Sequence, residues 1–279
     1  HHAILHTLEA LQAEGFTVTL LRPQADGIVT ATQVAEAITD TTCLVSVMYA
    51  NNETGAIQPI REIGALCRKR GVHFHTDAVQ AAGHLAIDVQ RNNIDMLSLS
   101  AHKFHGPKGI GLLFAKSSIQ LTSLIRGGGQ ERGKRAGTEN LPGIIGLAAA
   151  LKDAQENMQQ NTAYITGLRD ALRNGLDKID GAGFNGSREH CLPGTVNYSF
   201  QGVNGEALLS LLSNEGICCS SGSACSAGSL EPSHVLLALG LSHETAQSAL
   251  RFSLCEYNTM DEVQTIITKV TEAVNRLRR

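Results

Sequence analysis

Lys103 is the residue whose setting points most directly to chemistry. It lies in the run Ser98-Leu-Ser-Ala-His-Lys103-Phe-His-Gly-Pro-Lys-Gly109, after an apolar segment and within a turn that contains glycine and proline. Open parallel sheets bind ligands at the carboxyl ends of their strands, and a lysine in a dry pocket can form a Schiff base with an aldehyde cofactor. Ser100 and His102 offer a hydroxyl and an imidazole to an anionic group. An isolated lysine on a loop is more often simply solvated, so a second residue is needed.

Asp77 is that second residue. It lies in His75-Thr-Asp77-Ala-Val-Gln80, at the end of an apolar segment, where an unpaired buried charge is costly. The protonated ring nitrogen of pyridoxal phosphate is a cation that suits such a carboxylate, and Gln80 could donate to the ring hydroxyl. The alternative role for Asp77 is to cap the next helix. Taken together, Asp77 and Lys103 predict a pyridoxal phosphate site.

Two polar residues in other segments suit a ligand near this site. Asn52 lies in the turn after residues 42–49, which a parallel sheet would bring to the same edge as Asp77 and Lys103. Arg251 lies inside an apolar strand, and its guanidinium must meet an anion because it cannot be deprotonated. From spacing alone, a structural ion pair and a clamp for a substrate carboxylate are equally open for Arg251.

Cys225 is the candidate nucleophile. Small residues flank it in Ser220-Ser-Gly-Ser-Ala-Cys225-Ser-Ala-Gly-Ser229, which predicts an exposed thiol, and exposure favours reactivity. Cys218 and Cys219 follow an apolar residue and are predicted to be small core residues. A zinc site built from these three cysteines lacks the usual ligand spacing.

A second glycine-rich run nearly matches a nucleotide-binding phosphate loop. It spans Gly128 to Lys134, but Arg135 stands where the motif needs a hydroxyl for Mg²⁺. A nucleoside triphosphatase is therefore disfavoured. A glycine-rich turn that brings Thr138 to another phosphate stays open.

The elements that must position these residues alternate between strand-like and helical patterns. Such alternation predicts a mainly parallel sheet covered by helices. Strands are predicted at 16–21, 42–49, 72–77, 96–102 and 109–115, and helices at 1–14, 31–38 and 60–70. Further helices are predicted at 143–158, 161–178, near 205–214 and from 259 onward, with strands at 195–200 and 249–254. The fold class is α/β, with a large domain over 1–158 and a smaller α+β domain over 159–279.

Composition narrows the class of protein. The chain has 279 residues with 42% hydrophobic and 18% charged residues, which is typical of a globular protein. Lys+Arg 23 against Asp+Glu 26 gives a net charge of −3, which disfavours nucleic-acid binding. No apolar run is long enough for a membrane helix and no signal peptide is visible. Seven cysteines without a disulfide framework favour the cytoplasm. Because His1 begins the chain inside a helical pattern, we expect a missing upstream segment.

Five segments, taken in order, resemble the NifS/IscS-like cysteine desulfurases, which are class-V, aspartate-aminotransferase-type pyridoxal phosphate enzymes. These segments are HTDAVQ, SLSAHKFHGPKGIG, GGGQERGKRAGTEN, SSGSACSAGSLEPSHVL and ALRFSL. The resemblance implies the fold of type I pyridoxal-phosphate-dependent transferases and a homodimer. It also implies conversion of L-cysteine to L-alanine, with the sulfur held as a persulfide and passed to acceptor proteins for iron–sulfur cluster assembly.

The resemblance also implies roles for individual residues. Lys103 would carry the cofactor and act as a base, Asp77 would pair with the ring nitrogen, and Cys225 would take the sulfur. Arg251 would clamp the substrate carboxylate. The other implied cofactor contacts are Gln80, Asn52, Ser100, Ala101, His102, Thr138 from the neighbouring subunit, and His1. Asn52 would also contact the substrate, and His1 would stack on the ring and move protons. No intrinsic metal is implied, although Cys225 could transiently ligate an iron–sulfur cluster held by a scaffold protein.

Two alternatives stay open beside this interpretation. A related pyridoxal-phosphate-dependent aminotransferase would need Lys103 and Asp77 but no thiol in a Ser/Gly-rich segment. A catalytically impaired fragment would act only as a docking module, because the family's amino-terminal Gly-Ala-Thr phosphate turn has no counterpart in this sequence.

Overall fold

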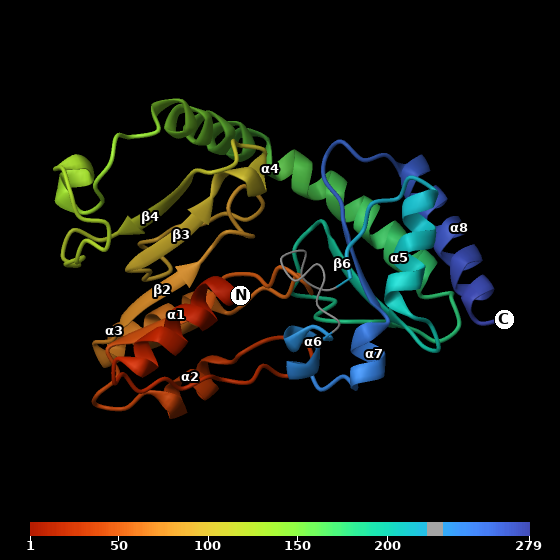
Figure 1. Ribbon diagram of the computed structural model, residues 1–279, viewed down its shortest axis with the longest axis horizontal. Helices are drawn as coiled ribbons and strands as arrows, with labels where there is room; N and C mark the ends of the chain where they lie inside the picture. The colour runs from red at the N-terminus through yellow and green to blue at the C-terminus, as the bar shows by residue number, and fades with distance from the viewer. Residues whose placement is uncertain (222–230) are drawn as a thin grey trace.

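The computed structural model describes residues 1–221 and 231–279, which form two sheets connected by one long helix (Figure 1). The larger sheet contains β1 (Leu44–Met48), β2 (His73–Asp77), β3 (Met96–Ser100) and β4 (Gly111–Ala115), in that spatial order. The first three strands are parallel, which confirms the predicted α/β class. β4 is antiparallel to β3, because the segment between them is too short to contain a crossover helix.

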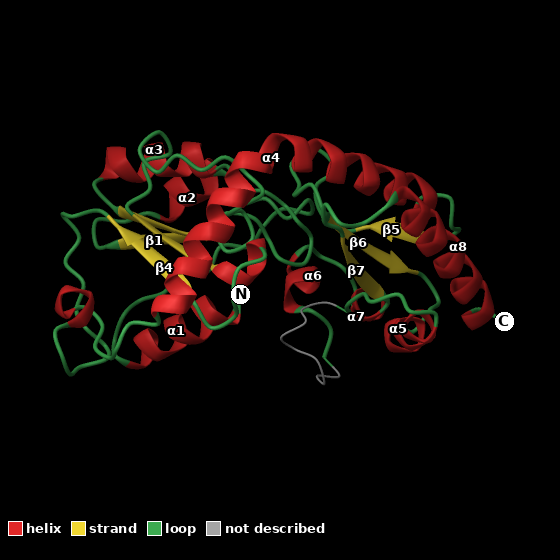
Figure 2. Ribbon diagram, turned by 90° about the horizontal axis from the view of Figure 1, so that it is seen from above, coloured by secondary structure: helices red, strands yellow, loops and turns green. Residues whose placement is uncertain are grey.

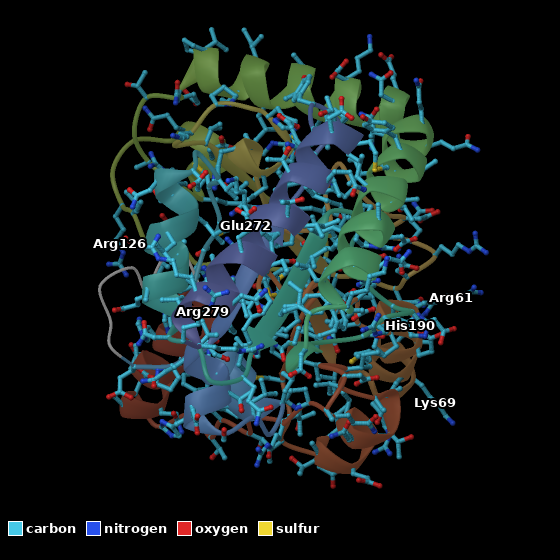
Figure 3. All side chains as sticks on the ribbon, turned by 90° about the vertical axis from the view of Figure 1, so that its right-hand side faces the viewer. Arg61, Lys69, Arg126, His190, Glu272 and Arg279 are labelled. Atoms are coloured by element: carbon cyan, nitrogen blue, oxygen red, sulfur yellow. The ribbon has the colours of Figure 1, made fainter. Side chains whose placement is uncertain are left out.

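Helices lie on both sides of this sheet, α1 (His2–Ala13) on one side and α3 (Ile60–Arg70) on the other (Figures 1 and 2). The short α2 (Ala31–Ala37) begins with a capping box at Thr30 and contacts α3. The core beneath α3 includes the fully buried Ile63 and Phe74. Charged side chains of α3, such as Arg61 and Lys69, point outward (Figure 3).

The strand predicted at 16–21 is wrong. These residues follow α1 without regular secondary structure and pair with no strand among the described residues. Phe16 and Leu20 are 54% and 66% exposed. A β-rich run forms a strand only when a neighbouring strand is available for its backbone hydrogen bonds, and local composition does not reveal that neighbour.

α4 (Leu141–Leu176) runs as one continuous helix where the sequence predicted two. The gap between the two predicted helices, 143–158 and 161–178, contains neither glycine nor proline, and polar residues are tolerated on an exposed helix face. The Asn140 side chain accepts a hydrogen bond from the Gly143 backbone at 3.1 Å and so caps the helix. The division between residues 158 and 159 falls within α4 and stays a prediction.

The smaller sheet is antiparallel and contains β5 (Ala182–Phe184), β6 (Thr195–Phe200) and β7 (Ala249–Ser253). The end of α4, α5 (Gly205–Asn214) and α8 (Met260–Leu277) bury its apolar side chains. α8 carries Glu272 near its end, and Arg279 follows it on the outer surface (Figure 3). Two short helices, α6 (His234–Ala238) and α7 (His243–Gln247), lie before β7 and were too short to predict. Among the described residues, no helix is long and apolar enough to cross a membrane.

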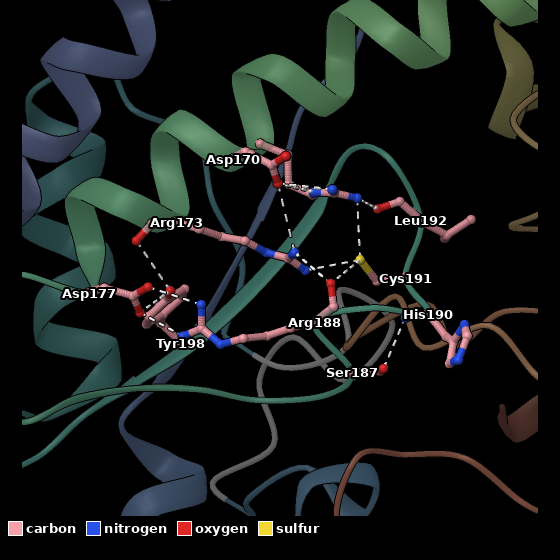
Figure 4. Close-up of polar contacts among 10 residues, drawn as sticks. Asp170, Arg173, Asp177, Ser187, Arg188, His190, Cys191, Leu192 and Tyr198 are labelled. Atoms are coloured by element: carbon pink, nitrogen blue, oxygen red, sulfur yellow. Dashed lines mark hydrogen bonds and ion pairs between the residues drawn. The ribbon is translucent and has the colours of Figure 1, made fainter.

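A polar cluster joins α4 to the smaller sheet (Figure 4). The buried Tyr198 donates a hydrogen bond to Asp177 at 2.7 Å, and the Arg188 guanidinium donates two more at 2.7 and 2.9 Å. These contacts hold the pKa of Asp177 below its ordinary value of 3.8, with the Arg188 hydrogen bonds as the largest cause. The cluster therefore stabilises the fold when Asp177 is ionised.

We expect acid to weaken this stabilisation. A carboxyl with a lowered pKa in the folded state stabilises the protein above its unfolded pKa, and the effect is lost as the pH falls through the folded pKa. Denaturant unfolding at pH 6 and pH 3 should therefore show a smaller acid-induced loss of stability in Arg188→Ala. The difference should be less than about 1 kcal/mol because the pair is partly solvated. Arg276→Ala, which changes an exposed arginine of α8, should behave as the wild type.

Candidate active site

Asp77 ends β2 at the edge of the larger sheet where the parallel strands terminate. It is 8% exposed, and its Oδ1 accepts a hydrogen bond from the Val79 backbone at 3.0 Å. Within the described part of the chain, no lysine or arginine forms an ion pair with it. A buried carboxylate in this setting suits a cationic ligand atom.

A polar ladder that sequence reasoning missed runs across the same face of the sheet. His75 contacts the Ser46 hydroxyl through Nδ1 at 2.8 Å and the Ser98 hydroxyl through Nε2 at 2.9 Å. Burial lowers the pKa of His75, and the nearby charge of Asp77 opposes that effect. Because side chains alternate along a strand, His75 and Asp77 share one face. The sequence signal that could have revealed this ladder is the two-residue spacing of polar side chains in strands that were predicted to be apolar.

Lys103 lies directly beyond β3, in the single-turn helix η1 (Ala101–Phe104). Its side chain is exposed, but the turn that carries it is fixed on both sides. Ala101 is fully buried and donates its backbone N–H to Ile110 at 3.1 Å, while Phe104 packs in a cluster with Leu147 of α4. A side chain at Gly106 would collide with Ala101, so the turn requires glycine there. Lys103 is therefore presented from a rigid platform.

The approach to Lys103 is electropositive. The Ser100 hydroxyl and the His102 Nδ1 lie 2.9 Å apart. Partial burial and the positive charges of Lys103 and Lys108 lower the pKa of His102. A hydroxyl, an imidazole and two ammonium groups in one turn suit a phosphate.

The structure brings together Asn52 and Arg251, which are far apart in sequence. Arg251 is on β7 of the smaller sheet, and its Nη1 donates to the Asn52 carbonyl oxygen at 2.8 Å. Beside them, Glu53 is only 2% exposed. Burial raises the pKa of Glu53, while its hydrogen bond from Ser233 and the charge of Arg251 lower it. The sequence analysis missed Glu53, because a charged residue in a turn is normally solvated.

The remaining predicted site residues differ in their exposure and local contacts. Gln80 is half-buried in the turn that follows Asp77. His1 is exposed and caps α1 by accepting the Ala3 backbone N–H at 3.1 Å. Thr138 is exposed in the segment before α4. The lime-green stretch just ahead of Thr138 lies far from the smaller sheet, which contains β6 and Arg251 (Figure 1). Cys225 lies outside the described residues. No cluster of three or more potential metal ligands forms in the described ranges.

Comparison with known proteins decides the family. Residues 1–266 match the family model for aminotransferase class-V. The chain belongs to this family. The cysteine desulfurase IscS of Clostridium botulinum strain Hall is 50% identical over 281 residues, which cover 100% of this chain and 71% of that protein.

Solved structures agree with the family assignment. A structure described as a NifS-like protein superposes with a TM-score of 0.91 at 37% identity and covers 99% of this chain and 73% of its own. A structure described as SspA in complex with cysteine has a TM-score of 0.77 at 39% identity, with 93% and 72% covered.

Class-V aminotransferases and cysteine desulfurases use pyridoxal phosphate, and the charge pattern of this site fits that cofactor. The cofactor has a cationic ring nitrogen at one end, a phosphate at the other and an aldehyde between them. The site offers a buried carboxylate at Asp77 and an electropositive turn at Ser100 and His102. Lys103 supplies the amine.

Proposed function

We propose that this protein is a cysteine desulfurase that converts L-cysteine to L-alanine and passes the sulfur to acceptor proteins that assemble iron–sulfur clusters. The observation that carries the proposal is the 50% identity to a cysteine desulfurase along the whole chain. The neighbouring positions of Asp77 and Lys103 at the ends of β2 and β3 support it.

We assign the cofactor contacts as follows. Asp77 pairs with the ring nitrogen, Lys103 holds the aldehyde carbon, and Ser100 and His102 bind the phosphate beside the buried Ala101. Gln80 and Asn52 contact the ring hydroxyl or the substrate amine, and His1 stacks on the ring. When bound, pyridoxal phosphate supplies an electron-withdrawing ring that stabilises negative charge at the substrate carbon.

The protein's side chains bind and orient the substrate and move its protons. Arg251 binds the carboxylate of L-cysteine, and its contact with the Asn52 carbonyl fixes the direction of the guanidinium. The Lys103 amine would remove the proton from the substrate α-carbon and later return a proton. Cys225 attacks the substrate sulfur as a thiolate.

The overall step balances without another reactant. The Cβ–S bond of L-cysteine breaks and an S–S bond to Cys225 forms. The substrate β-carbon is reduced to the methyl group of alanine as the two sulfur atoms become a persulfide, and the thiol proton ends on alanine. No external oxidant is therefore required.

We further propose that the protein acts in the cytoplasm as a homodimer in which Thr138 reaches the cofactor phosphate of the neighbouring subunit. Four large apolar side chains in the sequence segments before and after Thr138 are exposed, which is typical of an interaction surface. They are Leu124, Ile125, Leu141 and Ile145, with exposed fractions of 95%, 51%, 61% and 61%.

The proposed function is tested by incubating the purified protein with pyridoxal phosphate and L-cysteine. We expect alanine to form without a keto acid, and mass spectrometry should find one added sulfur on the peptide that contains Cys225. The six other cysteines are internal controls. Alanine formation that requires a keto acid would indicate an aminotransferase instead, and sulfur on another cysteine would contradict the role of Cys225.

A further inference from the structure

Glu53 is a buried carboxylate to which the proposed reaction gives no role. It follows Asn52 in the turn after β1 and is 2% exposed. Side-chain hydrogen bonds hold both its backbone N–H and its carbonyl. The Asn51 side chain accepts the Glu53 N–H at 2.8 Å, and the Asn197 side chain donates to the Glu53 carbonyl at 3.1 Å. Glu53 is therefore a fixed point between the two sheets.

The side chain of Glu53 binds the residue that begins α6. Its Oε2 accepts a hydrogen bond from the Ser233 hydroxyl. The same Ser233 oxygen accepts the backbone N–H groups of Val235 and Leu236 at 3.2 and 3.4 Å and so caps the helix. The buried carboxylate thus holds the start of α6 against the larger sheet.

A second contact ties the chain at Ser220 to the same turn. Ser220 and Arg251 exchange two backbone hydrogen bonds, at 3.1 and 2.7 Å, and Arg251 in turn donates to the Asn52 carbonyl. In sequence, Cys225 lies between Ser220 and Ser233. The two points that flank this cysteine are thus connected to the adjacent residues Asn52 and Glu53.

We propose that Glu53 is a positioning residue for sulfur transfer, because it holds Ser233 in place beside the turn that carries Asn52. This inference rests on the proposed function. Glu53 touches neither the reacting sulfur nor the substrate in this assignment, and it acts through the Ser233 hydroxyl.

The proposal predicts that loss of the Glu53 carboxylate slows the sulfur-transfer step but does not weaken the binding of L-cysteine. In Glu53→Ala, the first-order rate at which sulfur reaches Cys225 should fall about tenfold, with KM changed by less than about threefold. Glu53→Gln keeps an oxygen that accepts from Ser233 and should recover most of the rate. A Glu53→Ala rate equal to that of the wild type would overturn the proposal.

A double-mutant cycle separates this role from a general loss of stability. Ser233→Ala should slow sulfur arrival as Glu53→Ala does, and the double variant should be no slower than either single variant. Ser242→Ala is the matched control, because Ser242 caps the equally short α7 through Thr245 and makes no contact with Glu53 in the described structure. Fully additive losses, or an equal loss in the control, would contradict the proposal. If the wild type itself places no sulfur on Cys225, the proposed function fails before the variants are compared.

Discussion

Replacing Lys103 with alanine is expected to lower the rate of alanine formation from L-cysteine by about 10³-fold or more. In the proposed reaction the residue has two uses, because it holds the cofactor covalently and then acts as the base at the α-carbon. General base catalysis alone contributes about 10²–10⁴-fold, and loss of the covalent attachment adds to it. The visible absorption that appears when pyridoxal phosphate is added to the wild type should be absent or shifted in the variant.

The fold should survive this substitution. The Lys103 side chain is exposed, and the turn is held instead by the buried Ala101 and Phe104. Lys108→Ala is the matched control, because it removes another exposed lysine from the same turn without touching the proposed attachment point. It should weaken binding of the cofactor phosphate only slightly. Turnover by Lys103→Ala within tenfold of the wild type would show that another amine does the chemistry.

The positions of Asp77 and Lys103 could be predicted from the sequence for a local reason. Each ends an apolar segment, and parallel strands place their carboxyl ends at one edge of the sheet. Spacing along the chain therefore translates directly into position in space. The same logic located Asn52, which follows β1 by a few residues.

Contacts between the two sheets could not be predicted in this way. The hydrogen bond from Arg251 to Asn52 joins residues 199 positions apart, and it depends on how α4 sets one sheet against the other. The burial of Glu53 has the same origin, because neighbours from the smaller sheet and α6 remove a turn residue from water. The sequence pattern left an ion pair and a substrate clamp equally open for Arg251, since only tertiary packing decides what a buried arginine meets.

Replacing Asp77 with asparagine is expected to have opposite effects on the stability of the cofactor-free protein and on the stability gained when the cofactor binds. Without the cofactor, the variant should be as stable as the wild type or more stable by about 1 kcal/mol, because it removes a buried charge that has no lysine or arginine partner among the described residues. The amide oxygen of the introduced side chain can still accept the Val79 N–H. With pyridoxal phosphate added, the wild type should gain more stability, because a ligand that binds the folded state stabilises it in proportion to its affinity. Thermal unfolding of both proteins, with and without the cofactor, measures this reversal.

The activity of Asp77→Asn should fall by about 10²–10⁴-fold, because breaking a buried ion pair costs about 3–5 kcal/mol and each 1.4 kcal/mol is a factor of ten. Asp88→Asn provides the matched control. Its carboxylate accepts the backbone N–H two residues on at 2.9 Å, as Asp77 does, but it is exposed and is not one of the proposed ligand contacts. The control should change neither the stability gained from the cofactor nor the rate. If Asp77→Asn instead destabilised the cofactor-free protein and kept full activity, Asp77 would serve as a structural cap, and the cationic end of the cofactor would have to be bound by another group.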